Sequence, residues 1–160
     1  DVERSRGLGD VYKRQSLRDG TKKMSKSDPS DASRINLTDT AEEISNKIKK
    51  AKTDPHPLPD TIEELKDRPE AHNLMSIYSS LSDQTLEKAL IEFSGKGFSY
   101  FKPRLIDLAI ETLSPISREM RSLLKYRNEI DKILKNGEQK AKEIAEPVLK
   151  DVKNLVGFVN

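Results

Sequence analysis

The chain has 160 residues, of which 34% are hydrophobic and 35% charged, so it holds one modest core rather than two substantial domains. Aromatic residues make up only 5% and tryptophan is absent, which predicts a thin, aliphatic core. The 29 Lys and Arg residues nearly balance the 27 Asp and Glu residues, which excludes a strongly basic nucleic-acid clamp, and the absence of cysteine excludes disulfides, thiolate metal sites and cysteine nucleophiles.

Residues 1–15 differ in character from the rest of the chain. Gly7 and Gly9 lie between charged residues, and neither a helical nor an alternating period fits the segment. We therefore expect a disordered or extended lead-in over residues 1–15. The string VYKRQ at its end is typical of translated cloning sequence, so the segment is a candidate for non-native sequence and carries no functional inference.

Residues 16–39 predict a polar loop, and a helix follows it. The turn signal RDG comes directly after Leu17, and the string TKKMSKSDP behind it is rich in small hydroxyl residues and ends in proline. Thr40 and Glu43 have the spacing of a capping box, so a helix is expected from Thr40. Three prolines between residues 55 and 59 end this helix. Its apolar face is expected at Ile44, Ile48 and Ala51.

Two further helices are expected between residues 69 and 97. Pro69 suits a first turn, Ser82 is placed to cap the second helix, and Gly95 and Gly97 break it. The apolar positions that define the inner faces are Leu74, Ile77, Tyr78 and Leu81 in the first helix and Leu86, Ala89, Leu90 and Phe93 in the second.

The remaining sequence predicts helices separated by proline and glycine. One begins at Pro103 and is interrupted at Pro115, a second ends at Gly137, and a last one is kinked at Pro147. No strand with convincing alternation appears after the loop. The predicted fold class is therefore mainly α, a helical bundle preceded by a polar loop that carries lysines. The last helix has its apolar positions at Ala141, Ile144, Val148, Val152, Leu155 and Val156.

The run Lys23-Met24-Ser25-Lys26-Ser27 is the most informative feature for chemistry. Two ammonium groups three residues apart, with hydroxyl groups between and after them, can converge on one polyanion. Lysine suits a departing pyrophosphate because its flexible stem lets the charge follow the phosphates as they move. The alternative interpretation is a solvated charged loop, which is what most lysine-rich turns are.

The string KMSKS is also the signature of class I aminoacyl-tRNA synthetases, and its flanks narrow the match. From Ser16 to Asn160 the chain resembles the C-terminal half of bacterial tryptophanyl-tRNA synthetases. Tyrosyl enzymes are the nearest alternative, but their loop usually departs from this spelling at Met24 and Ser25. The strings that carry the resemblance are SLRDGTKKMSKSDPSDASRINLTD, KIKKAKTD, RPEAHNL and FKPRLIDLAIETLSPI.

The resemblance implies an enzyme that activates tryptophan with ATP, releases pyrophosphate and transfers the aminoacyl group to its cognate tRNA. Lys23 and Lys26 would be catalytic, stabilising the leaving pyrophosphate together with Mg²⁺. Met24, Ser25 and Ser27 would complete the ATP-binding loop, which closes over the triphosphate. No metal site built from protein side chains is expected.

The resemblance also implies a domain arrangement. Residues 16–39 would be the KMSKS loop at the edge of a truncated Rossmann-type nucleotide-binding domain, and residues 40–160 a helical domain on the anticodon side of tRNA. The full-length parent would be a cytoplasmic homodimer. From the sequence itself, nothing in the chain approaches about 18 consecutive apolar residues, so this chain is not expected to span a membrane. The helix with Ile44 and Ile48 would pack partly against the nucleotide-binding domain, so we expect an exposed apolar face there.

Several features of that family are missing from this sequence. Its second catalytic signature, a His-containing tetrapeptide, is absent, since His56 lies among prolines and His72 on a helix. The tryptophan pocket also belongs to the other half. We therefore expect the 160-residue chain alone to be inactive in adenylate formation.

RNA contacts are left open by the sequence. Lys47, Lys49, Lys50 and Lys52 either meet tRNA phosphates or form a solvated helix face. Two other functions also stay open, a non-catalytic helical tRNA-binding module and a helical interaction domain without a ligand. The aromatic residues are expected in the core rather than in base stacking; they are Tyr78, Phe93, Phe98, Tyr100, Phe101 and Tyr126.

Overall fold

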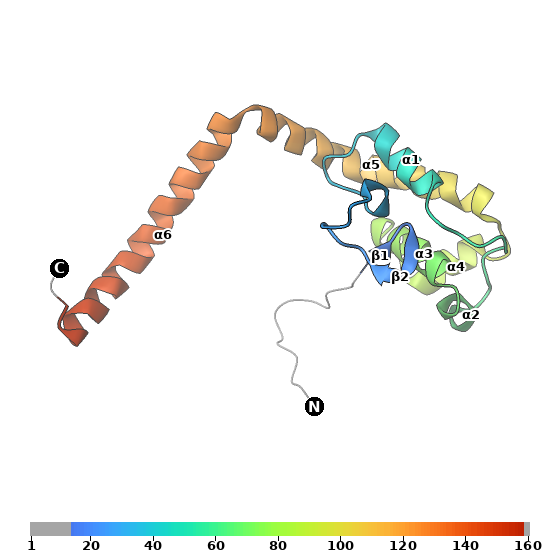
Figure 1. The fold of residues 1–160 in the computed structure, drawn as a ribbon, viewed down its shortest axis with the longest axis horizontal. Helices are drawn as coiled ribbons and strands as arrows, with labels where there is room; N and C mark the ends of the chain where they lie inside the picture. Colours follow the sequence, from blue (N-terminus) through green and yellow to red (C-terminus); the bar gives the residue numbers. More distant parts are fainter. Residues whose placement is uncertain (1–13, 159–160) are drawn as a thin grey trace. The chain divides into compact units, whose positions relative to one another are not determined.

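The computed structural model describes residues 14–158, and most of them are helical (Figure 1). The mainly α prediction is confirmed. The chain divides after Ser117 into two compact units. In chain order the elements are β1 (Gln15–Ser16), β2 (Asp19–Lys23), the 3₁₀ helix η1 (Asp31–Ser33), α1 (Ala41–Lys49), α2 (Ile62–Lys66), α3 (Pro69–Leu81), α4 (Leu86–Phe93), α5 (Phe98–Lys125) and α6 (Arg127–Val156).

The described structure starts inside the expected lead-in. Residues 1–13 lie outside the described residues, whereas Gln15 belongs to β1. The Gln15 N–H donates to the Asn73 side chain at 3.2 Å, and the Asn73 amide donates back to the Gln15 carbonyl at 2.9 Å. Residues 14 and 15 are therefore part of the fold, because the backbone of Gln15 pairs with a buried side chain of α3 and the Arg14 carbonyl accepts from the Met24 N–H.

The expected loop begins with a short hairpin. β1 and β2 pair antiparallel, with Gln15 opposite Lys23 and an irregular register at Gln15 and Ser16. This corrects the prediction that residues 16–23 are loop, since β2 has no apolar alternation that the sequence could reveal. Gly20 in β2 lies so close to α3 that a β-carbon there would be 2.6 Å from the backbone of Pro69 and Glu70. Glycine is required by this close approach of two backbones.

The core lies between α1, α3, α4 and the first half of α5, and its centre is aromatic. Phe93 packs edge-on against Tyr78 at 4.8 Å and against Phe101 at 4.9 Å, measured between ring centroids. Most of the buried core residues are aliphatic, as predicted, but the few aromatic residues gather at one point where three helices meet. Tyr78, Phe93, Phe98 and Phe101 are buried as expected, whereas Tyr100 and Tyr126 are exposed.

The α1 helix begins as its sequence indicates. The Thr40 hydroxyl accepts from the Glu43 N–H at 3.3 Å and the Glu43 carboxylate accepts from the Thr40 N–H at 2.7 Å, which is a complete capping box. Ile44 and Ile48 are both fully buried. The expectation of an exposed apolar face on this helix is therefore wrong, because Ile44 and Ile48 belong to the buried core cluster of this chain.

The boundary between α3 and α4 differs from the prediction at Ser82 and Thr85. Ser82 ends α3, and α4 is capped instead by Thr85, whose hydroxyl accepts from the Lys88 N–H at 3.3 Å. The sequence does not predict two short elements, η1 and α2, although Thr61 caps α2. Both are too short to display a helical period.

Proline and glycine interrupt the long helices less than the sequence suggests. α5 starts at Phe98, where the Gly97 carbonyl accepts from the next turn, and it continues through Pro103 and Pro115. α6 continues through Gly137 and Pro147. A single proline removes one donor and strains one turn, and the long helical stretches on both sides maintain the helix here. α6 ends at Gly157, whose φ of 79° allows a left-handed cap.

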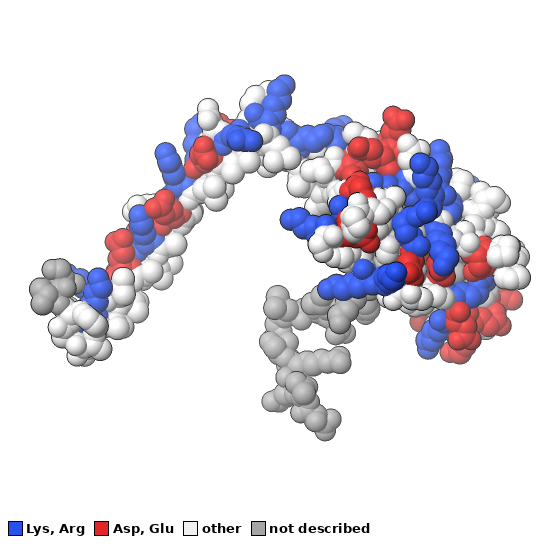
Figure 2. Space-filling view, in the orientation of Figure 1, with Lys and Arg blue, Asp and Glu red and all other residues white. Residues whose placement is uncertain are grey.

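α6 contains no buried residue. Charged side chains run along one side of the helix and uncharged ones along the other (Figure 2). Its predicted apolar positions are all exposed, including Ile144 and Val148. The sequence therefore predicts the helix and its apolar side correctly, but not a place for that side in the core.

Candidate functional site

The lysine-bearing run lies on the turn that leaves β2. Lys23 is the last residue of β2 and Lys26 lies in the following turn, and both lysines are exposed. The turn is closed by the Ser25 and Ser27 hydroxyls, 2.9 Å apart, and by the Asp28 N–H, which donates to the Ser25 carbonyl at 3.3 Å. The two hydroxyl groups thus hold the turn on which both lysines lie.

The entry to this turn is held by the hairpin. The Met24 N–H donates to the Arg14 carbonyl at 2.7 Å, and Met24 packs against the core. Gly20 rests on the start of α3, and buried Asn73 holds β1 from the same helix. Lys23 therefore extends from a hairpin whose position is set by α3.

The exit from the turn is held as well. The Arg34 side chain donates to the Asp28 carbonyl at 3.0 Å and forms an ion pair with Asp31 at 3.1 Å. The Leu17 N–H donates to the carbonyl of buried Ser33 at 2.9 Å. Residues 24–30 are consequently a short loop between two fixed ends.

Lys22 differs from Lys23 and Lys26 in its electrostatic contacts. Asp19 accepts from the Thr21 hydroxyl at 2.6 Å and from the Thr21 N–H at 3.1 Å, and it lies 3.2 Å from the Lys22 ammonium. These contacts, the Thr21 hydroxyl first, lower the pKa of Asp19 to about 2. Among residues 14–158, no ion pair links Lys23 or Lys26 to a carboxylate. Their charge is available to an external anion.

The four lysines of α1 and its C-terminal end do not form one surface. Lys47 is buried and pairs with Asp31 and Asp39, each at 2.6 Å. Lys52 pairs with Glu70 at 2.8 Å. The expectation that all four meet phosphates or solvent is wrong for Lys47, because it lies on the inward side of α1 between Ile44 and Ile48.

Both histidines lie outside the loop. His56 is exposed beside the prolines. His72 is half-buried in α3, and its burial, with the charges of Lys66 and Arg14, lowers its pKa. Within residues 14–158 no group of three or more His, Cys, Asp or Glu side chains is arranged to hold a metal ion.

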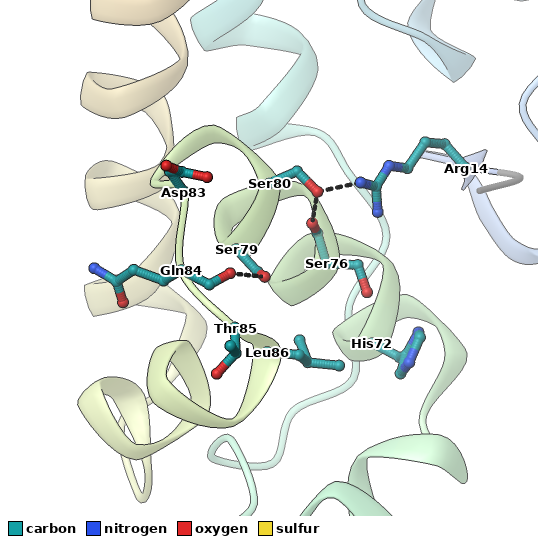
Figure 3. Close-up of a pocket in the computed structure, with 9 residues that line it drawn as sticks. All are labelled: Arg14, His72, Ser76, Ser79, Ser80, Asp83, Gln84, Thr85 and Leu86. Carbon is teal, nitrogen blue, oxygen red and sulfur yellow. Dashed lines mark hydrogen bonds between the residues drawn. The ribbon is translucent and has the colours of Figure 1, made fainter. Parts of the chain in front are cut away.

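A cavity of about 610 Å³ lies between α3 and the start of α4 (Figure 3). Arg14 reaches Ser80 from one side, and the Ser79 hydroxyl donates to the Gln84 carbonyl at 2.7 Å on another. Residues 23–27 do not line it. The cavity is therefore a separate, hydroxyl-rich feature that the sequence does not indicate.

None of the helices found in the described part of the chain combines the length and the apolar character that crossing a bilayer requires.

Comparison of the chain with known protein families agrees with what its lysine-bearing loop and its helical fold indicate. Residues 12–114 match the family of class I tRNA synthetases for tryptophan and tyrosine. Because this match covers more than half of the chain, the chain belongs to that family.

Individual relatives carry the name of the tryptophan enzyme. The chain is 57% identical over 143 residues to a tryptophan–tRNA ligase of Caulobacter vibrioides, covering 89% of this chain and 42% of that protein. It is 44% identical to the tryptophan–tRNA ligase of Synechocystis, covering 90% and 42% respectively. The chain thus spans about two fifths of the length of these curated relatives.

A solved structure supports the same fold. The tryptophanyl-tRNA synthetase of Mycoplasma pneumoniae superimposes with a TM-score of 0.68 at 25% identity, covering 92% of this chain and 46% of that one. These relatives do not favour the tyrosyl alternative or the non-catalytic RNA-binding module.

Proposed function

We propose that this chain is the C-terminal part of a tryptophan–tRNA ligase. The whole enzyme would activate tryptophan with ATP to form tryptophanyl-adenylate and pyrophosphate, and would then transfer the aminoacyl group to tRNA. Family membership and the names of the relatives support this proposal. Residues 16–39 would lie at the edge of the nucleotide-binding domain, and residues 40–160 would form the helical domain on the anticodon side of tRNA.

Lys23 and Lys26 are proposed to bind the triphosphate of ATP. Their ammonium groups would donate hydrogen bonds to phosphate oxygens and stabilise the charge that develops on pyrophosphate as its bond to the α-phosphorus breaks. Met24, Ser25 and Ser27 would shape the loop that presents them. The observation that carries the proposal is a pair of lysines without a carboxylate partner in residues 14–158, on a short loop with both ends held.

The remaining partners follow from the reaction. ATP would enter as its Mg²⁺ complex, because Mg²⁺ is usually bound largely through the phosphates of the substrate. Tryptophan and tRNA would be the other substrates, and Lys49 and Lys50 are candidates to meet tRNA phosphates. We also propose that the enzyme is cytoplasmic, because aminoacylation takes place where translation does. A homodimer is proposed only from the resemblance to the family.

The test is tryptophan-dependent pyrophosphate exchange by the full-length protein that contains this chain. Lys23→Ala and Lys26→Ala are each expected to lower the exchange rate by about 10²–10³, since each removes a cation that acts on the leaving group. Lys22→Ala is the matched control, because Lys22 is a neighbouring exposed lysine that pairs with Asp19. It is expected to keep the rate within about twofold.

The proposal is overturned if Lys26→Ala leaves the exchange rate within about twofold of the parent. An equal loss in all three variants would instead indicate a general effect of positive charge, and would remove the specific roles of Lys23 and Lys26.

A further inference from the structure

Lys47 is a charged residue in an unusual place. It lies in the last turn of α1, and its side chain is only 10% exposed. Its ammonium group lies 2.6 Å from Asp31 Oδ2 and 2.6 Å from Asp39 Oδ2. Burial lowers the pKa of Lys47, but the hydrogen bonds to both carboxylates more than offset this, so its pKa is raised and it stays charged.

The two carboxylates belong to the segment that leaves the lysine-bearing loop. Asp31 begins η1, and Asp39 directly precedes the N-cap of α1. Asn36 closes the group, because its backbone N–H donates to Asp39 at 2.8 Å and its side chain donates to Asp31 at 2.8 Å. We call Asp31, Asn36, Asp39 and Lys47 the Lys47 clamp.

The clamp connects the loop exit to the core. Ile44 and Ile48, on either side of Lys47 along the inward face of α1, are fully buried, so the backbone that carries Lys47 is anchored in the core. Arg34 extends the connection towards the loop through its contacts with Asp31 and with the Asp28 carbonyl. A chain of charged contacts therefore runs from the core to the residue two positions after Lys26.

We propose that Lys47 is a positioning residue, which holds the exit of the lysine-bearing loop so that Lys26 is placed to meet the departing pyrophosphate. The proposal rests on the function proposed above for Lys26. Cations that are held in place before the reaction stabilise its transition state without a cost for ordering them. A flexible exit would leave the charge of Lys26 intact but would lower the fraction of time it spends near the phosphates.

The main test variant is Asp31→Asn. It removes the exposed half of the clamp and leaves the buried Lys47–Asp39 pair in place, so folding is expected to be retained. In the full-length protein we expect kcat for pyrophosphate exchange to fall about tenfold or more, with KM for tryptophan changed by less than about twofold. Lys47→Met, which breaks both ion pairs, is expected to lower kcat further. Lys66→Met is the control, since Lys66 is an exposed lysine at the end of α2 without an ion pair to another described residue.

A double variant separates positioning from a general structural role. If Asp31 acts through Lys26, adding Asp31→Asn to Lys26→Ala is expected to change the rate by less than about twofold relative to Lys26→Ala alone. If the two losses multiply, the positioning role is overturned. Unchanged kcat in Asp31→Asn overturns it as well.

Hydrogen exchange distinguishes this inference from the proposed function. Asp31→Asn is expected to increase exchange in residues 25–36 while α3 and α4 keep their protection. If exchange in residues 25–36 does not increase, the clamp does not hold the loop and the inference fails. If it does increase but Lys26→Ala leaves activity unchanged, the proposed function of Lys26 fails, and the positioning role for that reaction falls with it.

Discussion

Two parts of the molecule have apolar residues repeated at helical spacing, but these residues are buried in one part and exposed in the other. In the part that ends at Ser117, the apolar faces of α1, α3, α4 and α5 meet in one core, where Ile48 and Phe101 are fully buried. α6 repeats apolar residues over 30 residues just as regularly, yet none of its residues is buried. Ile144 in α6 is 75% exposed.

The comparison shows that the amphipathic character of a helix and the burial of its apolar side are separate properties. A repeat of apolar residues at helical spacing makes one side of a helix apolar, which is a local property. Burial of that side requires a second surface of matching shape, which the helix does not supply by itself. α1 has such surfaces within the described chain, and α6 remains amphipathic without any buried side chain.

The largest expected effect comes from replacing an isoleucine by alanine, once in each of the two parts. Ile48→Ala is expected to lower the free energy of unfolding by about 2–5 kcal/mol, because it leaves a cavity in a closed core. Ile144→Ala is expected to change it by less than about 0.5 kcal/mol. Urea denaturation of the 160-residue chain followed by circular dichroism measures both. Equal losses at the two positions would show that the side chain of Ile144 is buried in solution, and would break the comparison.

A glycine pair is expected to give effects of opposite sign. Gly20→Ala places a methyl group 2.6 Å from the backbone of α3, so it is expected to cost about 1–3 kcal/mol of stability. Gly137 lies inside α6, and a β-carbon at this position would have nothing within 4 Å. Gly137→Ala is expected to stabilise by about 0.5–1 kcal/mol, because alanine loses less backbone entropy in a helix. Thermal unfolding of both variants tests the signs, and destabilisation by Gly137→Ala would contradict the description of α6.

The smallest expected effect concerns ion pairs. Arg68 donates to the two carboxylate oxygens of Asp54, at 2.9 and 2.5 Å. Burial would raise the pKa of Asp54, but these hydrogen bonds more than offset it and hold the pKa below its usual value. Asp54 therefore stabilises the fold above the pKa it has in the unfolded chain, and this contribution is lost as pH falls through its lower folded-state pKa.

Asp54→Asn is accordingly expected to cost about 1–2 kcal/mol at neutral pH, and its difference from the parent is expected to shrink below about pH 4. Denaturation curves at several pH values measure this difference. The matched substitution in α6 is Glu138→Gln, which breaks an exposed pair with Lys142 and is expected to have hardly any effect. A difference for Asp54→Asn that does not depend on pH would contradict the role of its charge.

Local signals are sufficient to predict some elements and insufficient for others. Thr40 with Glu43, and Pro69 at a first turn, are interactions within a few residues, and the structure confirms both helix starts. β2 escapes prediction because its position depends on the contact between Gly20 and α3. The sequence wrongly predicts a break at Pro115, because it does not show the stability of the helix around that residue.

In the candidate site, too, some residues could be predicted from the sequence and others could not. Lys23 and Lys26 are identified from their spacing and from a family resemblance. The residues that hold the loop are missed, because Asp31 and Asp39 are distant in sequence from the ammonium group they contact. One signal is present for Lys47, which occupies the inward position between Ile44 and Ile48 in the helical repeat.

By itself the sequence determined that this protein is mainly helical, where its principal helices lie and which residues could meet a polyanion. These are properties of neighbouring residues, because caps, periods and turn signals act over a few positions. The tertiary structure alone decided which apolar faces are buried, that the aromatic residues cluster at one point within the core, and that Lys47 pairs with Asp31 and Asp39. The physical reason is that burial and charge pairing depend on surfaces brought together by the whole fold, and no local pattern encodes which surfaces meet.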